Sequence, residues 1–260
     1  MKVHAKDKPL ADNVNLEALA KATAGFTGAD LANLLNEAAL LAAGKSRAVI
    51  TMKDLEEAMI KVIAGPEKRS RVVSQYERKL TAFHEAGHAI AMYCLPTQDP
   101  VHMITIVPRG MAGGMTISLP QDDQSFVSKS EMFETIVGFL GGRVAEQLKL
   151  DDISTGASND IEQATKLARA MLTRYGMSDE FGMVALETVT NQYLGGDASL
   201  ACSPETQTKI DRLVVELVER QHQKALQILR DDRQKLDELA RFLHEKETIT
   251  GEEFMSILNA

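Results

Sequence analysis

Residues 81–88 read TAFHEAGH, so that His84 and His88 stand four positions apart and Glu85 follows the first of them. Positions i and i+4 of an α-helix lie about one turn apart on nearly the same face. Two imidazole nitrogens at this spacing can bind one Zn²⁺ at about 2.0–2.1 Å. Glu85 lies about 100° further round the helix, where a carboxylate can take a proton from a water on the metal. The stretch therefore predicts a helix that carries a zinc-peptidase site.

The neighbouring residues favour a buried helix over a charged surface helix. Phe83, Ala89, Ile90 and Met92 are apolar, and a His-Glu-His cluster among such residues is costly to bury without a partner. A chance match is the alternative, because the H-E-x-x-H pattern fixes only three positions. The chain has only 6 histidines, and two of them occupy this pattern, which favours the metal site.

A catalytic zinc needs a third protein ligand and an open fourth position, and histidine is a poor candidate for that ligand here. The longer pattern H-E-x-x-H-x-x-G-x-x-H has Ala91 in place of the glycine and Cys94 in place of the last histidine. Without the glycine, the helix carries Cys94 onto another face, so we expect a core cysteine. His102 falls in a predicted strand, and the histidines at 222 and 244 fall in polar helical segments.

Two acidic residues are better candidates for the third ligand. Glu146 follows the glycine pair at 141–142, which permits close helix packing, on a predicted helix. Asp160 stands where a loop ends and a helix begins, a position in which an acid also stabilises the helix dipole by about 0.3–1 kcal/mol. From the residues alone, the choice between Glu146 and Asp160 stays open.

Helical periodicity dominates the chain, which predicts a mainly α fold. Residues 1–66 carry equal numbers of basic and acidic residues, and Gly65-Pro66 ends their helical pattern. We expect a small helical module there and a second unit over 67–260. The pattern predicts helices near 16–25, 30–43, 51–63, 129–148, 160–175, 204–230, 232–245 and 251–258, and strands at 101–107 and 115–119.

Composition excludes several classes of protein. The chain has 260 residues and a formal net charge of −8, all of it after residue 66. Phosphate binding needs a surplus of Lys and Arg, so we expect no nucleic-acid partner. The 2 cysteines lie far apart, which argues against a disulfide scaffold. No apolar run approaches the roughly 18–20 residues that span a bilayer, so we expect a soluble chain without a transmembrane segment.

Several short motifs follow one another along the chain. They are His84-Glu85-Ala86-Gly87-His88, Asp99-Pro100-Val101-His102, Ile106-Val107-Pro108-Arg109-Gly110, Gly141-Gly142-Arg143-Val144-Ala145-Glu146 and Ser154-Thr155-Gly156-Ala157-Ser158-Asn159-Asp160. Together they closely resemble the peptidase domain of the FtsH family, the AAA-linked zinc metalloproteases. Two earlier motifs resemble the family's small helical AAA subdomain: Gly25-Phe26-Thr27-Gly28-Ala29-Asp30-Leu31 and Asn36-Glu37-Ala38-Ala39-Leu40.

This resemblance implies a helical AAA lid at 1–66 and, at 67–260, a mostly helical zincin-like peptidase domain with a small β-sheet. It implies that Asp160 is the third zinc ligand beside His84 and His88, and that Glu146 is a supporting group nearby. It also implies one zinc per protomer, with Glu85 as the catalytic base of an endopeptidase.

The resemblance also concerns parts outside this chain. The family's ATPase needs a P-loop, and Gly44-Lys45-Ser46 is not one, because Ala39 stands where the motif requires glycine. We therefore expect the C-terminal part of such a protein, with ATP used only at full length and a partial nucleotide contact at Gly28 and Ala29. The full-length protein is expected to be anchored in a membrane, with this part on the cytoplasmic side in bacteria or its equivalent in an organelle.

Partners follow from the same resemblance. The expected substrates are unfolded or membrane proteins that the missing ATPase core feeds to the peptidase. Family members resemble one another in forming six-membered rings, so we expect a homo-hexamer. The predicted tail helix has apolar positions over a wide arc, which fits either a ring contact or burial within one protomer; these are Leu213, Val214, Val215, Leu217 and Val218.

Two further hypotheses concern the substrate and the class of function. The short strand with Met115, Thr116 and Ile117 has glycines before it and a proline after it, which suggests a sheet edge that an extended peptide can pair with. An ordinary paired strand is the alternative. A different class also stays open, namely a helical assembly module with a structural or inactive metal site. Glu85 disfavours that class, because a structural site has no use for a general base.

Overall fold

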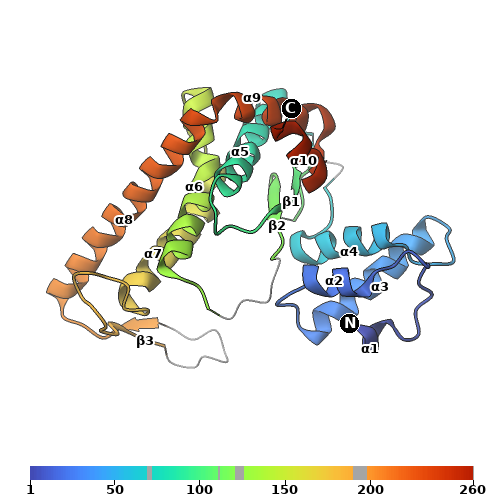
Figure 1. Ribbon diagram of the computed structural model, residues 1–260, viewed down its shortest axis with the longest axis horizontal. Helices are drawn as coiled ribbons and strands as arrows, with labels where there is room; N and C mark the ends of the chain where they lie inside the picture. Colours follow the sequence, from blue (N-terminus) through green and yellow to red (C-terminus); the bar gives the residue numbers. More distant parts are fainter. Residues whose placement is uncertain (69–71, 111, 121–125, 190–197, 260) are drawn as a thin grey trace.

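The computed structural model describes residues 1–68, 72–110, 112–120, 126–189 and 198–259, and it is mainly helical, as the sequence predicts. The helices are α1 (Lys2–Ala5), α2 (Leu16–Ala22), α3 (Gly28–Gly44), α4 (Met52–Ala64), α5 (Gln75–Tyr93), α6 (Lys129–Leu150), η1 (Thr155–Ala157), α7 (Ser158–Thr173), α8 (Pro204–Asp231), α9 (Arg233–Lys246) and α10 (Gly251–Leu258). The strands are β1 (Val101–Thr105), β2 (Met115–Ser118), β3 (Glu187–Val189), β4 (Ala198–Leu200) and β5 (Thr248–Thr250). Figure 1 shows α1–α4 in a smaller body that contains the N-terminus and α5–α10 in a larger one.

In the smaller body, α3 and α4 each begin with a capping box. Thr27 and Asp30 form one of them, so that α3 begins at Gly28, two residues before its predicted start. Thr51 and Asp54 form the predicted box at the start of α4. The helices enclose an apolar core made of Leu19, Leu34, Leu35, Ala38, Ala42, Ile50, Leu55, Ala58 and Met59.

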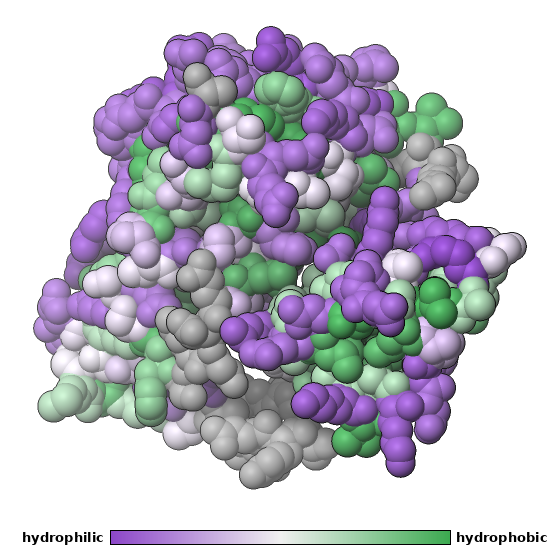
Figure 2. All heavy atoms as spheres, turned by 45° about the vertical axis from the view of Figure 1, so that its right-hand side comes forward, coloured by the Kyte–Doolittle hydropathy of each residue, from purple (hydrophilic) through white to green (hydrophobic). Residues whose placement is uncertain are grey.

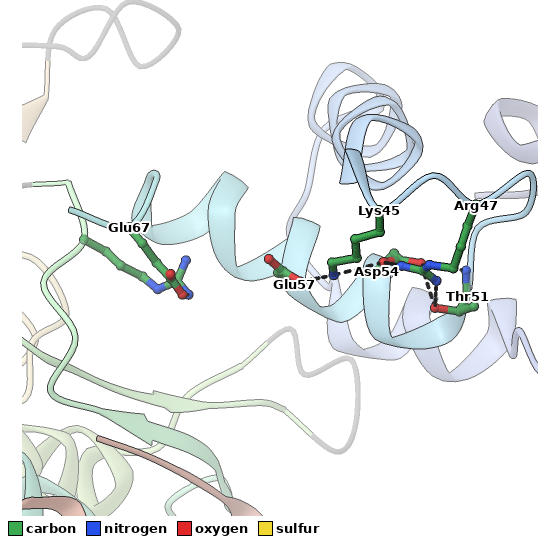
Figure 3. Close-up of polar contacts among 7 residues, drawn as sticks. Lys45, Arg47, Thr51, Asp54, Glu57 and Glu67 are labelled. Atoms are coloured by element: carbon green, nitrogen blue, oxygen red, sulfur yellow. Dashed lines mark hydrogen bonds and ion pairs between the residues drawn. The ribbon is translucent and has the colours of Figure 1, made fainter. Parts of the chain in front are cut away.

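Asp54 also anchors an ion-pair network where α3 turns into α4 (Figure 3). Its side chain is fully buried and accepts hydrogen bonds from Arg47 at 2.7 Å and from the Thr51 hydroxyl at 2.7 Å. Lys45 lies between Asp54 and Glu57, at 3.4 Å and 2.9 Å. The hydrogen bonds from Arg47 hold the pKa of Asp54 well below its usual range, although burial opposes them.

This network makes the stability of the smaller body depend on pH. The pKa of Asp54 is lowered in the folded chain, so its carboxylate stabilises the fold above its ordinary pKa of about 3.9. That contribution disappears as the pH falls further. We expect Asp54→Asn to lower the free energy of unfolding by about 2 kcal/mol at pH 7, and by less near pH 3. Urea unfolding of both proteins at the two pH values measures the difference.

In the larger body, α5 and α6 pack very closely. A Cβ atom on Gly87 of α5 would collide with the backbone carbonyl of Gly141 on α6, and one on Gly141 would lie 2.6 Å from the carbonyl of Gly87. Only glycine on both sides allows this approach. The close packing predicted from the glycine pair is confirmed, and it brings the stretch of α5 from His84 to His88 against α6.

A small antiparallel sheet with the strand order β2-β1-β5 lies beside α5. The order makes β2 an edge strand, as its flanking glycines and proline suggested. Figure 1 shows β1 and β2 between the larger body and α4. The sequence did not predict β5, or the two-stranded ribbon of β3 and β4, because strands of three residues are too short to show an alternating pattern.

The tail helix α8 buries most of its apolar arc within this protein. Val214 and Leu217 are buried, Leu213 and Val218 are partly buried, and Val215 is 68% exposed. The face shown in Figure 2 is largely hydrophilic, with apolar residues in small separate groups. The burial of α8 gives no independent support to a ring, which stays a prediction.

Among the described residues, no helix is long and apolar enough to span a membrane.

Candidate metal centre

Helices α5 and α7 bring three donor atoms to one point. The Nε2 atoms of His84 and His88 lie 3.1 Å apart, and Oδ2 of Asp160 lies 3.3 Å from the first and 3.6 Å from the second. Donor atoms bound to a tetrahedral zinc at about 2.0–2.1 Å lie about 3.3–3.4 Å from one another. The triangle therefore has the size that zinc requires. Within the described part of the chain, no other group of histidine, cysteine and acidic side chains converges in this way.

The hydrogen bonds of the two Nδ1 atoms determine whether the Nε2 atoms carry a proton or a lone pair. Nδ1 of His88 donates a hydrogen bond to the Gly138 carbonyl at 2.8 Å, and Nδ1 of His84 donates to the Glu146 carboxylate at 2.7 Å. A neutral imidazole with its proton on Nδ1 has a lone pair on Nε2. Two lone pairs and the carboxylate of Asp160 thus face one another, and a cation between them satisfies all three.

The pKa values of these groups reflect the same demand for positive charge. Burial lowers the pKa of His84, but the hydrogen bonds to Asp160 and Glu146 outweigh it and raise the pKa to about 9. Burial raises the pKa of Asp160, but the hydrogen bonds to His84 and His88 hold it well below the usual range. Protons and a metal ion compete for such a site, so acid weakens metal binding.

Glu146 supports His84 rather than offering a free ligand atom. Its side chain is fully buried. Its Oε1 accepts from Nδ1 of His84 and from the Ser154 hydroxyl at 3.0 Å, and its Oε2 accepts from the Ser154 amide at 2.8 Å. Burial raises the pKa of Glu146, but the interactions with His84 and Ser154 together outweigh burial and lower the pKa. This geometry favours Asp160 over Glu146 as the third ligand.

Gly142 on α6 lies against the Nε2 ends of the two rings. A Cβ atom at this position would lie 2.5 Å from Nε2 of His88 and 2.6 Å from Nε2 of His84. Real Cβ contacts are essentially never this short, so a methyl group here would force the Nε2 ends of both rings to move. The sequence pattern marks Gly142 only as one of two adjacent glycines that permit close packing, although its backbone lines the site.

Glu85 lies beside the donor atoms and is held by the edge strand. Its side chain is buried, and Oε2 accepts a hydrogen bond from the Thr116 hydroxyl at 2.8 Å. Burial raises the pKa of this carboxyl, against the opposing effects of His88, His84 and Thr116. A Cβ atom on Gly114 would lie 2.8 Å from Oε1 of Glu85, so this position also leaves room for the carboxylate.

Alternate residues of β2 face opposite neighbours. Thr116 faces Glu85, whereas Met115 and Ile117 pack in a small apolar cluster with Ile60 of α4. Strand β2 therefore lies between Glu85 of α5 and α4, the last helix of the smaller body.

The other residues named from the sequence lie away from this centre. Gly28 and Ala29 are exposed in the first turn of α3, and their nucleotide contact stays a prediction. Cys94 caps the end of α5, is partly buried against the core, and donates a hydrogen bond to Asp232 at 3.3 Å. His102 lies in β1.

Two protein-family models match this chain, and one of them covers the candidate metal centre. The sequence model of peptidase family M41 matches residues 71–257, a range that includes His84, Glu85, His88, Glu146 and Asp160. The chain belongs to peptidase family M41. A second model, that of the AAA+ lid domain, matches residues 13–57. The M41 peptidase therefore follows an AAA+ lid, as the resemblance to the FtsH family implied.

Relatives with this arrangement are ATP-dependent zinc metalloproteases named FtsH. That of Caldicellulosiruptor bescii is 52% identical over 99% of this chain, and FtsH 1 of Thermoanaerobacter sp. is 51% identical over 100%. That of Veillonella parvula is 51% identical over 96%. This chain spans about two fifths of the length of these relatives: the matches cover 42%, 43% and 39% of their sequences, respectively. It carries the peptidase domain of an FtsH-type zinc metalloprotease.

Proposed function

We propose that this chain is a zinc-dependent endopeptidase in which His84, His88 and Asp160 hold one zinc ion and Glu85 is the general base. The convergence of three donor atoms at 3.1–3.6 Å supports the proposal most directly. The assembly-module alternative fits less well. A structural zinc site is closed by four protein ligands, whereas three donor side chains meet here beside a buried glutamate.

Each residue of the centre has a definite part in the chemistry. When bound, zinc supplies a Lewis acid that lowers the pKa of a water molecule and polarises a carbonyl group. Glu85 takes a proton from the attacking water and later donates it to the amine nitrogen as the peptide bond breaks. Burial raises the pKa of Glu85, which favours acceptance of the proton from water. Thr116 orients the carboxylate, and Glu146 and the Gly138 carbonyl keep the histidine protons on Nδ1.

We propose further that the peptide substrate adds to the edge of the sheet along Met115, Thr116 and Ile117. The position of β2 at the end of the strand order supports this, and so does the hydrogen bond from Thr116 to Glu85. Pairing through backbone groups gives affinity with little dependence on sequence. An extended chain on this edge lies next to the general base.

Two variants of Thr116 separate these roles. Thr116→Val removes the hydroxyl and keeps the backbone N–H, so kcat should fall about tenfold while KM stays near the wild-type value. Thr116→Pro removes the N–H as well, and KM should rise by roughly another tenfold. Peptide hydrolysis kinetics at equal zinc content measure both constants. An unchanged KM in Thr116→Pro would argue against peptide capture by this strand.

The activity itself is tested with an unfolded protein such as casein. We expect hydrolysis that a zinc chelator stops and added zinc restores. Casein that stays intact with a zinc-loaded chain would contradict endopeptidase activity of this part by itself.

The larger assembly is a proposal drawn from the family. The AAA+ lid match and the ATP-dependent relatives support a full-length protein in which an ATPase core unfolds soluble or membrane proteins and feeds them to the peptidase. We propose domains at 1–66 and 67–260, a homo-hexamer, and a membrane anchor outside this chain. Light scattering over a concentration series measures the oligomeric state.

A further inference from the structure

The three donor side chains differ in the hydrogen-bond partners that orient them. His84 is held by Glu146 and His88 by the Gly138 carbonyl. Among the described residues, the carboxylate of Asp160 contacts polar groups only at the two histidines. Metal ligands are normally oriented by outer hydrogen-bond partners. The orientation of Asp160 must therefore come from the backbone that carries it.

That backbone is tied to the histidine side of the site at Ser154. The Ser154 amide and hydroxyl both donate to Glu146, at 2.8 Å and 3.0 Å. Its hydroxyl also accepts from the Gly156 amide at 3.0 Å, and its carbonyl accepts from Nη2 of Arg143 at 2.7 Å. These hydrogen bonds fix one loop residue between α6 and α7.

The path from Ser154 to Asp160 is short and helical. Residues Thr155–Ala157 form η1, and α7 follows at Ser158 without an extended linker. Ala157 is fully buried, which anchors the junction of the two helices in the interior. Because packed interiors transmit displacement rather than absorb it, a shift of Ser154 moves Asp160.

We propose that Ser154 is a positioning residue of the metal centre, which ties the helix of Asp160 to the carboxylate that orients His84. The inference rests on the ligand set proposed above. Glu146 then orients two ligands, His84 directly and Asp160 through Ser154. Removing the hydroxyl loosens both the contact with Glu146 and the cap on the Gly156 amide.

The test is the zinc affinity of the purified chain, measured by competition with a chromophoric chelator. Ser154→Ala should bind zinc about 10–100-fold more weakly than the wild type. Ser154→Thr keeps the hydroxyl and should restore most of the affinity. Thr155→Ala is the matched control, because Thr155 is exposed and its side chain makes no hydrogen bond within the described chain; it should bind zinc like the wild type. The visible absorption of the cobalt-substituted protein should change in Ser154→Ala alone.

Equal zinc affinity in Ser154→Ala and the wild type would overturn the proposal. An equal loss in Thr155→Ala would also overturn it, because general loosening of the loop would explain the result. If circular dichroism shows that Ser154→Ala does not fold, Arg143→Met carries the test. That variant frees the Ser154 carbonyl and should weaken zinc binding about tenfold, and unchanged affinity overturns the proposal. A wild-type chain without zinc affinity would contradict the proposed function itself, so the two failures are distinguishable.

Discussion

The variant Glu85→Gln should keep its zinc and its fold while proteolysis falls by about 10²–10⁴-fold. The amide has nearly the same size as the carboxylate and can still accept the hydrogen bond from Thr116. It cannot take a proton from water, which is the step that the proposed mechanism assigns to Glu85. The proposed zinc ligands His84, His88 and Asp160 are unchanged in this variant.

Casein hydrolysis at matched zinc content measures the effect. Glu77→Gln is a suitable control, because it makes the same chemical change two turns earlier on α5 and should leave hydrolysis unchanged. Full activity in Glu85→Gln would show that Glu85 is not the general base and that another group takes the proton from water.

The variant Gly142→Ala should lose zinc binding almost completely. Its methyl group would lie 2.5–2.6 Å from the Nε2 atoms of both histidines, so both rings must move and the arrangement of the donor atoms would be disturbed. Gly142 is buried in α6, and the atoms nearest an added Cβ atom are the tips of two side chains and not backbone, so the helix itself is expected to stay folded. Zinc content after dialysis and the circular dichroism spectrum together measure this.

Gly44→Ala provides the comparison for Gly142→Ala. Gly44 is also helical, and an added Cβ atom there meets nothing within 4 Å. It should retain wild-type zinc content and activity. If Gly142→Ala binds zinc as tightly as the wild type, the ion does not sit between the two imidazole rings.

The sequence predicted those parts of the site that depend on spacing within one helix. His84, Glu85 and His88 could be assigned from positions i, i+1 and i+4 alone. Glu146 and Asp160 could not be distinguished in that way, because both are acids on predicted helices. The distinction lies in tertiary contacts. Both carboxylate oxygens of Glu146 accept hydrogen bonds from Ser154, whereas the carboxylate of Asp160 lies against His84. The resemblance to a family supplied the choice that local patterns could not.

The roles of Gly142, Thr116 and Ser154 were beyond the sequence patterns for a related reason. A glycine next to another glycine signals close packing, but it does not say which side chains approach it. The Thr116 hydroxyl reaches Glu85 only because β2 pairs with β1 at the sheet edge. The long helices were predicted well because their apolar periodicity extends over several turns, whereas β5 was missed because three residues show no period.

The zinc content of the purified chain and two variants tests the central claim most directly. Mass spectrometry after dialysis should find about one zinc per wild-type chain. Asp160→Asn loses the proposed anionic ligand and should lose most of the metal. Glu146→Gln removes no proposed ligand and changes only a group that orients the ligands, so it should retain more of the metal. A wild-type chain without zinc, or a Glu146→Gln variant stripped of zinc beside an Asp160→Asn variant that keeps it, would contradict the account.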